Sequence, residues 1–195
     1  MGSQQLARQV QAHWLRYHIY EKLLLKSWNK TFLSVDLQGI GPLKGNMSFW
    51  IVVTGLEIYE KTKELEFKKH GFKSTRNKLA QNIASGDCLI FYITGKKQFA
   101  GIVEVTSKVI YDDSRVWQSK KKPDEMYPFR VNTKPVITLE EDKWLNAETY
   151  HERLMWTKKW PRKNWTLAYQ GSLREIPKND YAILLADFKS TKKQG

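Results

Sequence analysis

The sequence predicts an α+β domain, a small β-barrel with flanking helices, preceded by an amphipathic N-terminal helix. Short β-branched and aromatic runs alternate with turns from about residue 49 onward, and a few segments between them have helical spacing. In the first 28 residues, apolar side chains instead recur every three or four positions. We therefore divide the chain into a helical extension with a linker, residues 1–46, and a globular domain, residues 47–195.

The N-terminal segment is expected to be one amphipathic helix, followed by a linker with three glycines and a proline between residues 39 and 45. The apolar stripe of this helix consists of Leu6, Val10, Trp14, Tyr17, Leu24 and Trp28. One interpretation is that the helix packs on the domain or on a second copy of the chain, which gives a homo-oligomer. The other is a helix that binds a membrane surface or a partner, although its polar face carries few basic residues.

Strands of the domain are predicted where apolar β-formers are concentrated, at residues 49–53, 88–93, 99–105, 130–133 and 136–139, the last two separated by Pro135. Between them, residues 56–67 have helical spacing and residues 69–73 are expected to form a loop. Ser74 or Thr75 is a candidate N-cap for a helix that includes Leu79, Ala80 and Ile83. Two further helices are predicted, at residues 140–154 and 180–188.

The net charge of +13 favours acidic partners such as nucleic acid, anionic membranes or acidic proteins, although many lysine-rich proteins use their charge only for solubility. No apolar run approaches the roughly 20 residues that span a bilayer. A single cysteine, Cys88, permits no internal disulfide, so we expect a reducing compartment and place the protein in the cytoplasm.

Residues that could carry catalysis are not grouped in the sequence. The four histidines are scattered without metal-ligand spacing, and no phosphate-binding glycine motif or nucleophile elbow occurs. Cys88 lies within an apolar strand, where a buried, inert thiol is the usual interpretation. We therefore expect a protein that is not an enzyme and that needs no cofactor and no metal.

Aromatic residues instead occur within basic loops. Trp117 lies in a polar segment that ends in Lys120, Lys121 and Lys122, and Trp156 and Trp160 flank Lys158 and Lys159. Exposed rings stack on bases while Lys and Arg neutralise phosphates, so this pattern is typical of nucleic-acid binding. Trp156 and Trp160 could equally lie on one face of a helix that packs on the barrel. Trp117, in contrast, does not belong to any regular repeat of apolar residues.

Several ordered segments resemble the landmarks of EVE domains, which belong to the PUA-like barrels and are related to YTH and ASCH domains. They are residues 47–54, 74–77, 86–92, 99–105, 170–172 and Ile176-Pro177. The resemblance covers about residues 47–185 and implies a PUA-like fold. YTH domains read a methylated base in an aromatic cage, so the resemblance also implies a reader of modified RNA or DNA.

Carried onto this sequence, the resemblance places the two cage walls at Phe72 and Trp117. Phe72 stands where YTH domains have Trp, which makes one wall smaller. The other implied base-binding residues are Ser74, Thr75, Asn77, Gln170, Gly171 and Ser172. The expected phosphate contacts are Arg76, Lys120, Lys121, Lys122, Lys158, Lys159, Arg162 and Lys163. The alternative is a protein-interaction or oligomerisation module with a non-specific basic surface.

Overall fold

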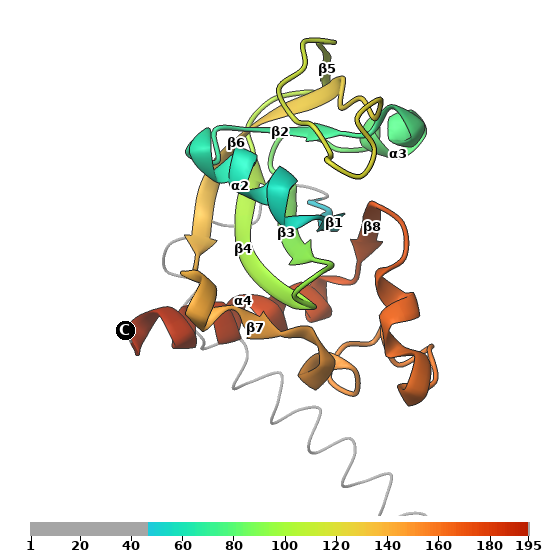
Figure 1. Ribbon diagram of the computed structural model, residues 1–195. Helices are drawn as coiled ribbons and strands as arrows, with labels where there is room; N and C mark the ends of the chain where they lie inside the picture. Colours follow the sequence, from blue (N-terminus) through green and yellow to red (C-terminus); the bar gives the residue numbers. More distant parts are fainter. Residues whose placement is uncertain (1–46, 195) are drawn as a thin grey trace, which may run out of the picture. The chain divides into compact units, whose positions relative to one another are not determined.

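The computed structural model describes residues 47–194. The main path of their sheet has six strands, and the sheet is curled (Figure 1). In the order β2-β6-β4-β3-β1-β8, these strands span Lys69–Phe72, Phe129–Thr138, Gln98–Val105, Cys88–Ile93, Phe49–Thr54 and Leu173–Ile176. The short strands β5 (Ile110–Tyr111) and β7 (Leu145–Asn146) pair with β6 and β4. Only β1 and β3 run parallel. Because β2 and β8 end the path without pairing to each other, the sheet is a half-barrel, which corrects the small β-barrel that was predicted.

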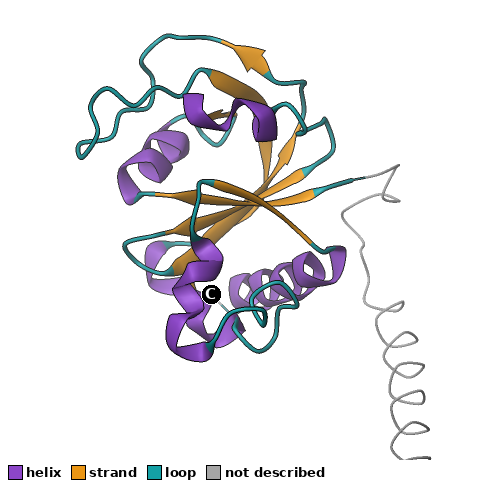
Figure 2. Cartoon of the chain, turned by 90° about the vertical axis from the view of Figure 1, so that its right-hand side faces the viewer, coloured by secondary structure: helices purple, strands orange, loops and turns teal. Residues whose placement is uncertain are grey.

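Helices lie on both sides of this sheet (Figure 2). The α-helices span Leu56–Glu64 (α2), Asn77–Ala80 (α3) and Lys178–Lys193 (α4). The 3₁₀ helices span Ser74–Arg76 (η1), Glu141–Lys143 (η2), Ala147–Tyr150 (η3) and Arg162–Tyr169 (η4). This arrangement confirms the α+β class with flanking helices. The predicted N-terminal helix, residues 1–46, lies outside the described residues.

The core is centred on β3, whose six residues are all buried. A strand that has neighbours on both edges and helices over both faces must be apolar throughout, which is why residues 88–93 form a continuous apolar run. Asp87 fixes the start of this strand. Its buried carboxylate accepts hydrogen bonds from the backbone N–H groups of Ser48 and Ala84 and from the indole Nε1 of Trp50. The turn after α3 is thereby attached to β1.

Three sequence-based predictions about loops and helices are wrong. Residues 69–73 are not a loop, because residues 69–72 form the edge strand β2 through pairing with β6, a partner distant in sequence. Residues 140–154 are not one helix, because β7 pairs with β4 and separates η2 from η3. The helix expected after Ser74 or Thr75 begins with η1 instead, and neither residue caps it.

Pro135 does not divide the region around it into two strands. Residues 129–138 form the single strand β6, and Pro135 lies opposite Val103 at a register shift in the pairing with β4. A proline cannot donate a ladder hydrogen bond, and a bulge is one of the places in a sheet where that loss is tolerated. The strands predicted at residues 49–53, 88–93 and 99–105 are confirmed.

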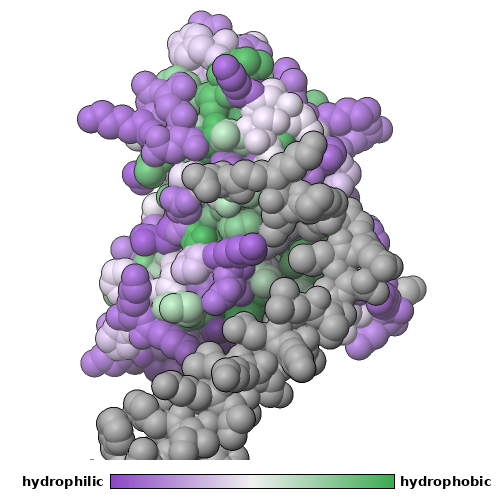
Figure 3. Space-filling view, turned by 180° about the vertical axis from the view of Figure 1, so that it is seen from behind, coloured by the Kyte–Doolittle hydropathy of each residue, from purple (hydrophilic) through white to green (hydrophobic). Residues whose placement is uncertain are grey.

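Few large hydrophobic side chains are exposed among the described residues: Leu79, Ile110, Tyr111 and Met155. On the face opposite to that of Figure 1, hydrophilic side chains project between small apolar patches wherever the domain is visible (Figure 3). Within residues 47–194, no helix combines the length and the apolar character that crossing a bilayer requires.

Candidate nucleic-acid interface

A small cavity lies between the C-terminal ends of β1 and β2. Its walls come from residues 52–54 of β1, residues 70–73 at the end of β2, and Ile58, Tyr127 and Ser172. The cavity has a volume of about 20 Å³, which is enough for roughly one water molecule. It is therefore a small pocket whose lining includes both polar and aromatic side chains.

Phe72 is one aromatic wall of this cavity. It is the last residue of β2, where its backbone pairs with Phe129, and its side chain is buried. Its ring meets the ring of His70 edge to face, with the centroids 5.3 Å apart. Tyr127 lines the cavity as a second aromatic residue, and its hydroxyl donates to Glu125 over 2.8 Å.

Trp117 lies in the layer behind the cavity and is not among the residues that line it. Its side chain is 2% exposed and packs in a cluster with Ile58 and Tyr127. The ring also covers Gly71, where an added Cβ would lie 2.7 Å from the Cε3 atom of Trp117. Only glycine permits this approach between β2 and the indole. The structure therefore places Trp117 as a support of the cavity wall.

His70 is a neutral, buried member of the cavity wall. The Thr62 hydroxyl donates its one proton to the carbonyl of Ile58 and accepts from the Nε1 of Trp117, at 3.0 Å each. The Nδ1 of His70, 3.1 Å from the same hydroxyl, must then act as a donor, which leaves Nε2 without a proton. Burial lowers the pKa of this imidazole from 6.5 to about 3, so it remains uncharged at neutral pH.

Two polar bridges lie beside the cavity. The Lys73 ammonium is 3.0 Å from a carboxylate oxygen of Glu125, and the Nε of Arg76 donates to the Ser172 hydroxyl over 3.0 Å. Burial opposes ionisation of Glu125, but hydrogen bonds from Lys73 and Tyr127 outweigh it and lower the pKa of this carboxyl. The side chains of Lys73 and Arg76 are thus held next to the aromatic walls, each by a contact to another side chain of the domain.

The structure brings together only part of the predicted base-binding set. Phe72 and Ser172 line the cavity, and Gly171 lies near the Arg76 guanidinium. Apart from the buried Trp117, the other predicted residues are exposed and do not line it: Ser74, Thr75, Asn77 and Gln170. Gly171 adopts φ +91°, a left-handed conformation that glycine accepts without strain and that turns the chain into β8.

The cavity residues that are missing from the predicted set include His70, Lys73 and Tyr127. His70 and Phe72 are two residues apart in β2. A strand prediction there would have placed both side chains on the same face of the sheet. Tyr127 has no comparable local signal, because it lies in the irregular segment 111–129. Only the packing of that segment against α2 and β2 brings it to the cavity.

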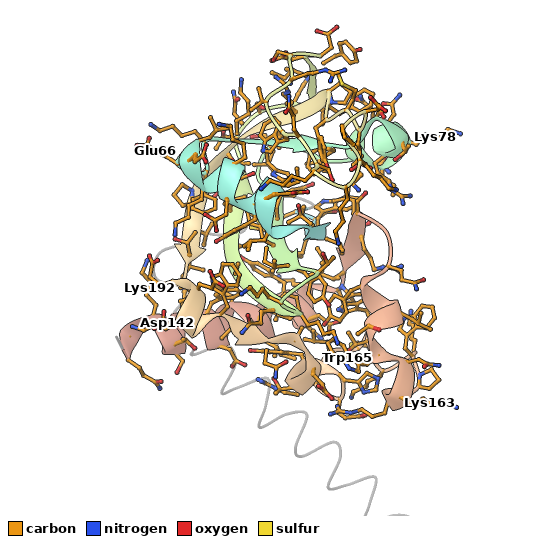
Figure 4. All side chains as sticks on the ribbon, viewed as in Figure 1. Glu66, Lys78, Asp142, Lys163, Trp165 and Lys192 are labelled. Carbon is orange, nitrogen blue, oxygen red and sulfur yellow. The ribbon has the colours of Figure 1, made fainter. Side chains whose placement is uncertain are left out.

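The predicted phosphate contacts lie in three separate groups. Lys120, Lys121 and Lys122 are exposed in the loop beside α2, where the backbone N–H of Lys120 donates to Glu57. Arg76 lies beside Ser172. The third group, Lys158, Lys159, Arg162 and Lys163, is exposed around the start of η4. In Figure 4, Lys78 of α3, close in sequence to Arg76, and Lys163 of η4 mark opposite ends of one side of the domain.

Groups that could carry other chemistry are sparse. Within residues 47–194, no three His, Cys, Asp or Glu side chains come close enough to hold a metal ion. Cys88 is buried in β3, and burial raises the pKa of its thiol to about 11, far from the range of a reactive thiolate.

Comparisons with known proteins identify the family and the fold. The family model described as "EVE domain" matches residues 48–186. A UPF0310 protein of Pyrococcus horikoshii is 30% identical over 152 residues, and the match covers 71% of this chain and 97% of that protein.

Among solved structures, the YTH domain of Zygosaccharomyces rouxii MRB1, in complex with N6-methyladenosine RNA, superposes with a TM-score of 0.56. The two chains are 17% identical, and the match covers 76% of this chain and 90% of the YTH domain. The Pho92 YTH domain in complex with m6A gives a TM-score of 0.55 at 16% identity, covering 76% of this chain and 87% of that one. At these identities the likeness establishes a shared fold.

Proposed function

The chain belongs to the EVE domain family, and from this we propose that it binds nucleic acid and holds one extruded, methylated base in the cavity between β1 and β2. The observation that carries the proposal is the composition of that cavity. Aromatic side chains (Phe72 and Tyr127), a neutral imidazole (His70) and a hydroxyl (Ser172) converge there, next to two cationic side chains. The proposed activity is recognition without catalysis.

Physical chemistry favours a modified base in such a pocket. A base leaves its stack at a cost of a few kcal/mol, which aromatic contacts and hydrogen bonds to the base edge must offset. A methyl group adds apolar contact with the faces of Phe72 and Tyr127 that an unmodified base lacks. Two YTH domains of the same fold were solved with N6-methyladenosine RNA or m6A, which supports the choice of ligand class.

The cavity must widen before a base can enter, because its present volume is about that of one water molecule. We propose that the two bridges beside it open on binding. Lys73 would exchange Glu125 for a phosphate, and Arg76 would exchange Ser172 for another. Each cation then gains a charge-assisted partner, while Ser172 becomes free to hydrogen-bond the base edge. Trp117 would remain behind Gly71 as the support of the wall.

A titration with single strands that carry one modified base tests this function. The ligands are RNA and DNA strands of one sequence, each with one methylated or one plain base. We expect the methylated strand of one type to bind at least tenfold more tightly than its plain counterpart. The Phe72→Ala variant should lose most of that preference, since stacking on one ring contributes about 1–3 kcal/mol.

Tyr111→Ala is the matched control, because it removes an aromatic ring that is 68% exposed and outside the cavity. It should leave the preference unchanged. Thermal melting of both variants shows whether Phe72→Ala is still folded. Equal affinity of the wild-type protein for methylated and plain strands, in both RNA and DNA, would contradict the proposed function.

A further inference from the structure

A second and larger pocket lies beside β8 and shares no lining residue with the cavity between β1 and β2. Its volume is about 340 Å³, and its walls combine Met155, Trp156, Lys159 and Trp160 with Arg174 and Pro177. None of these residues lines the first cavity. We call this site the Trp160–Arg174 pocket.

The aromatic side of this pocket is held in place by buried polar groups. The buried carboxylate of Asp180 accepts hydrogen bonds from the backbone N–H groups of Met155 and Trp156, over 2.8 and 3.0 Å. The buried imidazole of His151 contacts the carbonyl of Trp160 through Nε2, at 2.8 Å. The two indoles therefore belong to a turn whose backbone is fixed before any ligand binds, which reduces the entropic cost of binding.

The cationic side of the pocket is not neutralised by an ion pair. The Arg174 guanidinium lies over the Trp156 ring, 5.6 Å from its centroid, and forms no salt bridge within the described part of the chain. Glu175, the acidic residue of the lining, accepts a hydrogen bond from the Ser48 hydroxyl over 2.7 Å. Arg174 therefore remains available to an external acceptor.

Two buried donors in the same walls also lack partners. The Nε1 of Trp156 and the Nε of Arg174 form no hydrogen bond in residues 47–194. A buried donor without an acceptor destabilises the site, so an oxygen that reached it would be bound favourably. Trp160 is half-buried and Met155 is exposed, which leaves an apolar surface beside these donors. A planar apolar group that carries oxygen atoms or negative charge matches this combination.

We propose that the Trp160–Arg174 pocket is a second nucleotide subsite for the strand whose extruded base enters the first cavity. A flanking base stacks on Trp160 against Met155, and Arg174 with Lys159 contacts the adjoining phosphate. The identity of the ligand rests on the proposed function, whereas the pocket itself does not.

The strand β8 connects the two sites. Ser172, immediately before β8, lines the first cavity, and Arg174 lines the second. At about 3.3 Å per residue, their Cα atoms are about 7 Å apart. The subsite therefore suits a nucleotide one or two positions from the extruded base.

A length series tests the subsite with the full chain. Fluorescence anisotropy would measure the affinity for labelled strands that carry the methylated base with none, one, two or four nucleotides added on either side. We expect a rise of about tenfold when the first one or two nucleotides are added on one side, and a flat series on the other. Trp160→Ala and Arg174→Ala should each remove this rise without changing the affinity for the shortest strand.

A conservative variant and a variant outside both pockets test whether the rise in affinity depends on these two side chains. Trp160→Phe retains a stacking face and should restore most of the rise. Lys143→Ala removes an equal charge at an exposed site outside both pockets and should leave the rise intact. A wild-type series that is flat on both sides overturns the subsite, as does a rise that survives both Trp160→Ala and Arg174→Ala. If methylated and plain strands bind equally but the rise disappears in these variants, the subsite stands and the base-reader function fails.

Discussion

At the scale of single residues, His70 shows how burial sets the chemistry of the site. Its ring is enclosed by Phe72, Phe91 and Trp117, with centroid distances of 5.3, 5.1 and 6.0 Å. In this environment the charged imidazolium is strongly disfavoured, and the pKa falls to about 3. Because Nε2 carries no proton, the side chain can accept a hydrogen bond from a base without adding charge to the cavity.

This burial gives a pH-dependent stability with a definite sign. Between about pH 6.5 and pH 3 the unfolded chain binds a proton at His70 that the folded chain excludes. The free energy of unfolding is therefore unaffected by this titration above about pH 6.5. Below it, the free energy of unfolding decreases as the pH falls, by about 1.4 kcal/mol per pH unit. Urea unfolding of wild type and His70→Asn at pH 7, 6 and 5 checks this. The difference in the free energy of unfolding should change by about 2 kcal/mol toward pH 5, and pH-independent differences would contradict it.

At the scale of elements, the sheet is organised by a few buried polar groups that connect distant segments. Asp87 attaches the turn after α3 to β1, and Asp180 of α4 fixes the turn that carries Trp156. Both carboxylates are almost fully buried and accept backbone hydrogen bonds. Such groups position the elements around the two pockets without contacting a ligand themselves.

The connection through Asp87 can be tested by its removal. Asp87→Ala leaves the N–H groups of Ser48, Ala84 and Trp50 without their acceptor. Since each buried unpaired donor costs about 1–3 kcal/mol, we expect a loss of about 3 kcal/mol or more in the free energy of unfolding. Asp113→Ala, at an exposed position, is the control and should change stability by less than about 0.5 kcal/mol. Chemical denaturation measures both, and similar small losses would show that Asp87 is dispensable.

At the scale of the whole molecule, the predicted phosphate-binding lysines and arginines, all within the described residues, lie in separate groups rather than in one patch. In Figure 4, Lys163 on η4 and Lys192 on α4 lie on opposite sides of the domain. A strand that passes from the first cavity along β8 would approach the group around η4, and would leave the charges near Lys192 free. Net charge alone therefore does not define the interface.

Salt dependence separates specific phosphate contacts from a surface that is basic for solubility. Each phosphate contact on a single strand contributes about −0.7 to the slope of log affinity against log salt concentration. We expect the double variant Lys158→Ala, Lys163→Ala to reduce the magnitude of this slope by about 1.4. The double variant Lys143→Ala, Lys192→Ala removes the same charge elsewhere and should change it much less. If the two double variants alter the slope equally, the basic surface acts non-specifically.

The sequence alone determined the family and most of the central strands. Runs such as residues 88–93 are buried on both faces wherever they pair, so their composition indicates a strand without knowledge of the partner. The ordered landmarks along residues 47–185 likewise predicted the EVE domain, because motifs keep their order in the chain. The edge strand β2 and the broken segment 140–154 were beyond prediction, since pairing with β6 and β4 decides them.

Only the tertiary structure decided which aromatic and basic residues share a site. Phe72 and Trp117 were predicted as two facing walls, but packing places Trp117 behind Gly71 and brings Tyr127 and His70 to the cavity in its stead. The hydrogen bond between Arg76 and Ser172 joins residues 96 positions apart. Composition and spacing describe a residue's near neighbours in the chain, whereas a binding site is formed where long-range strand pairing and loop packing bring distant segments together.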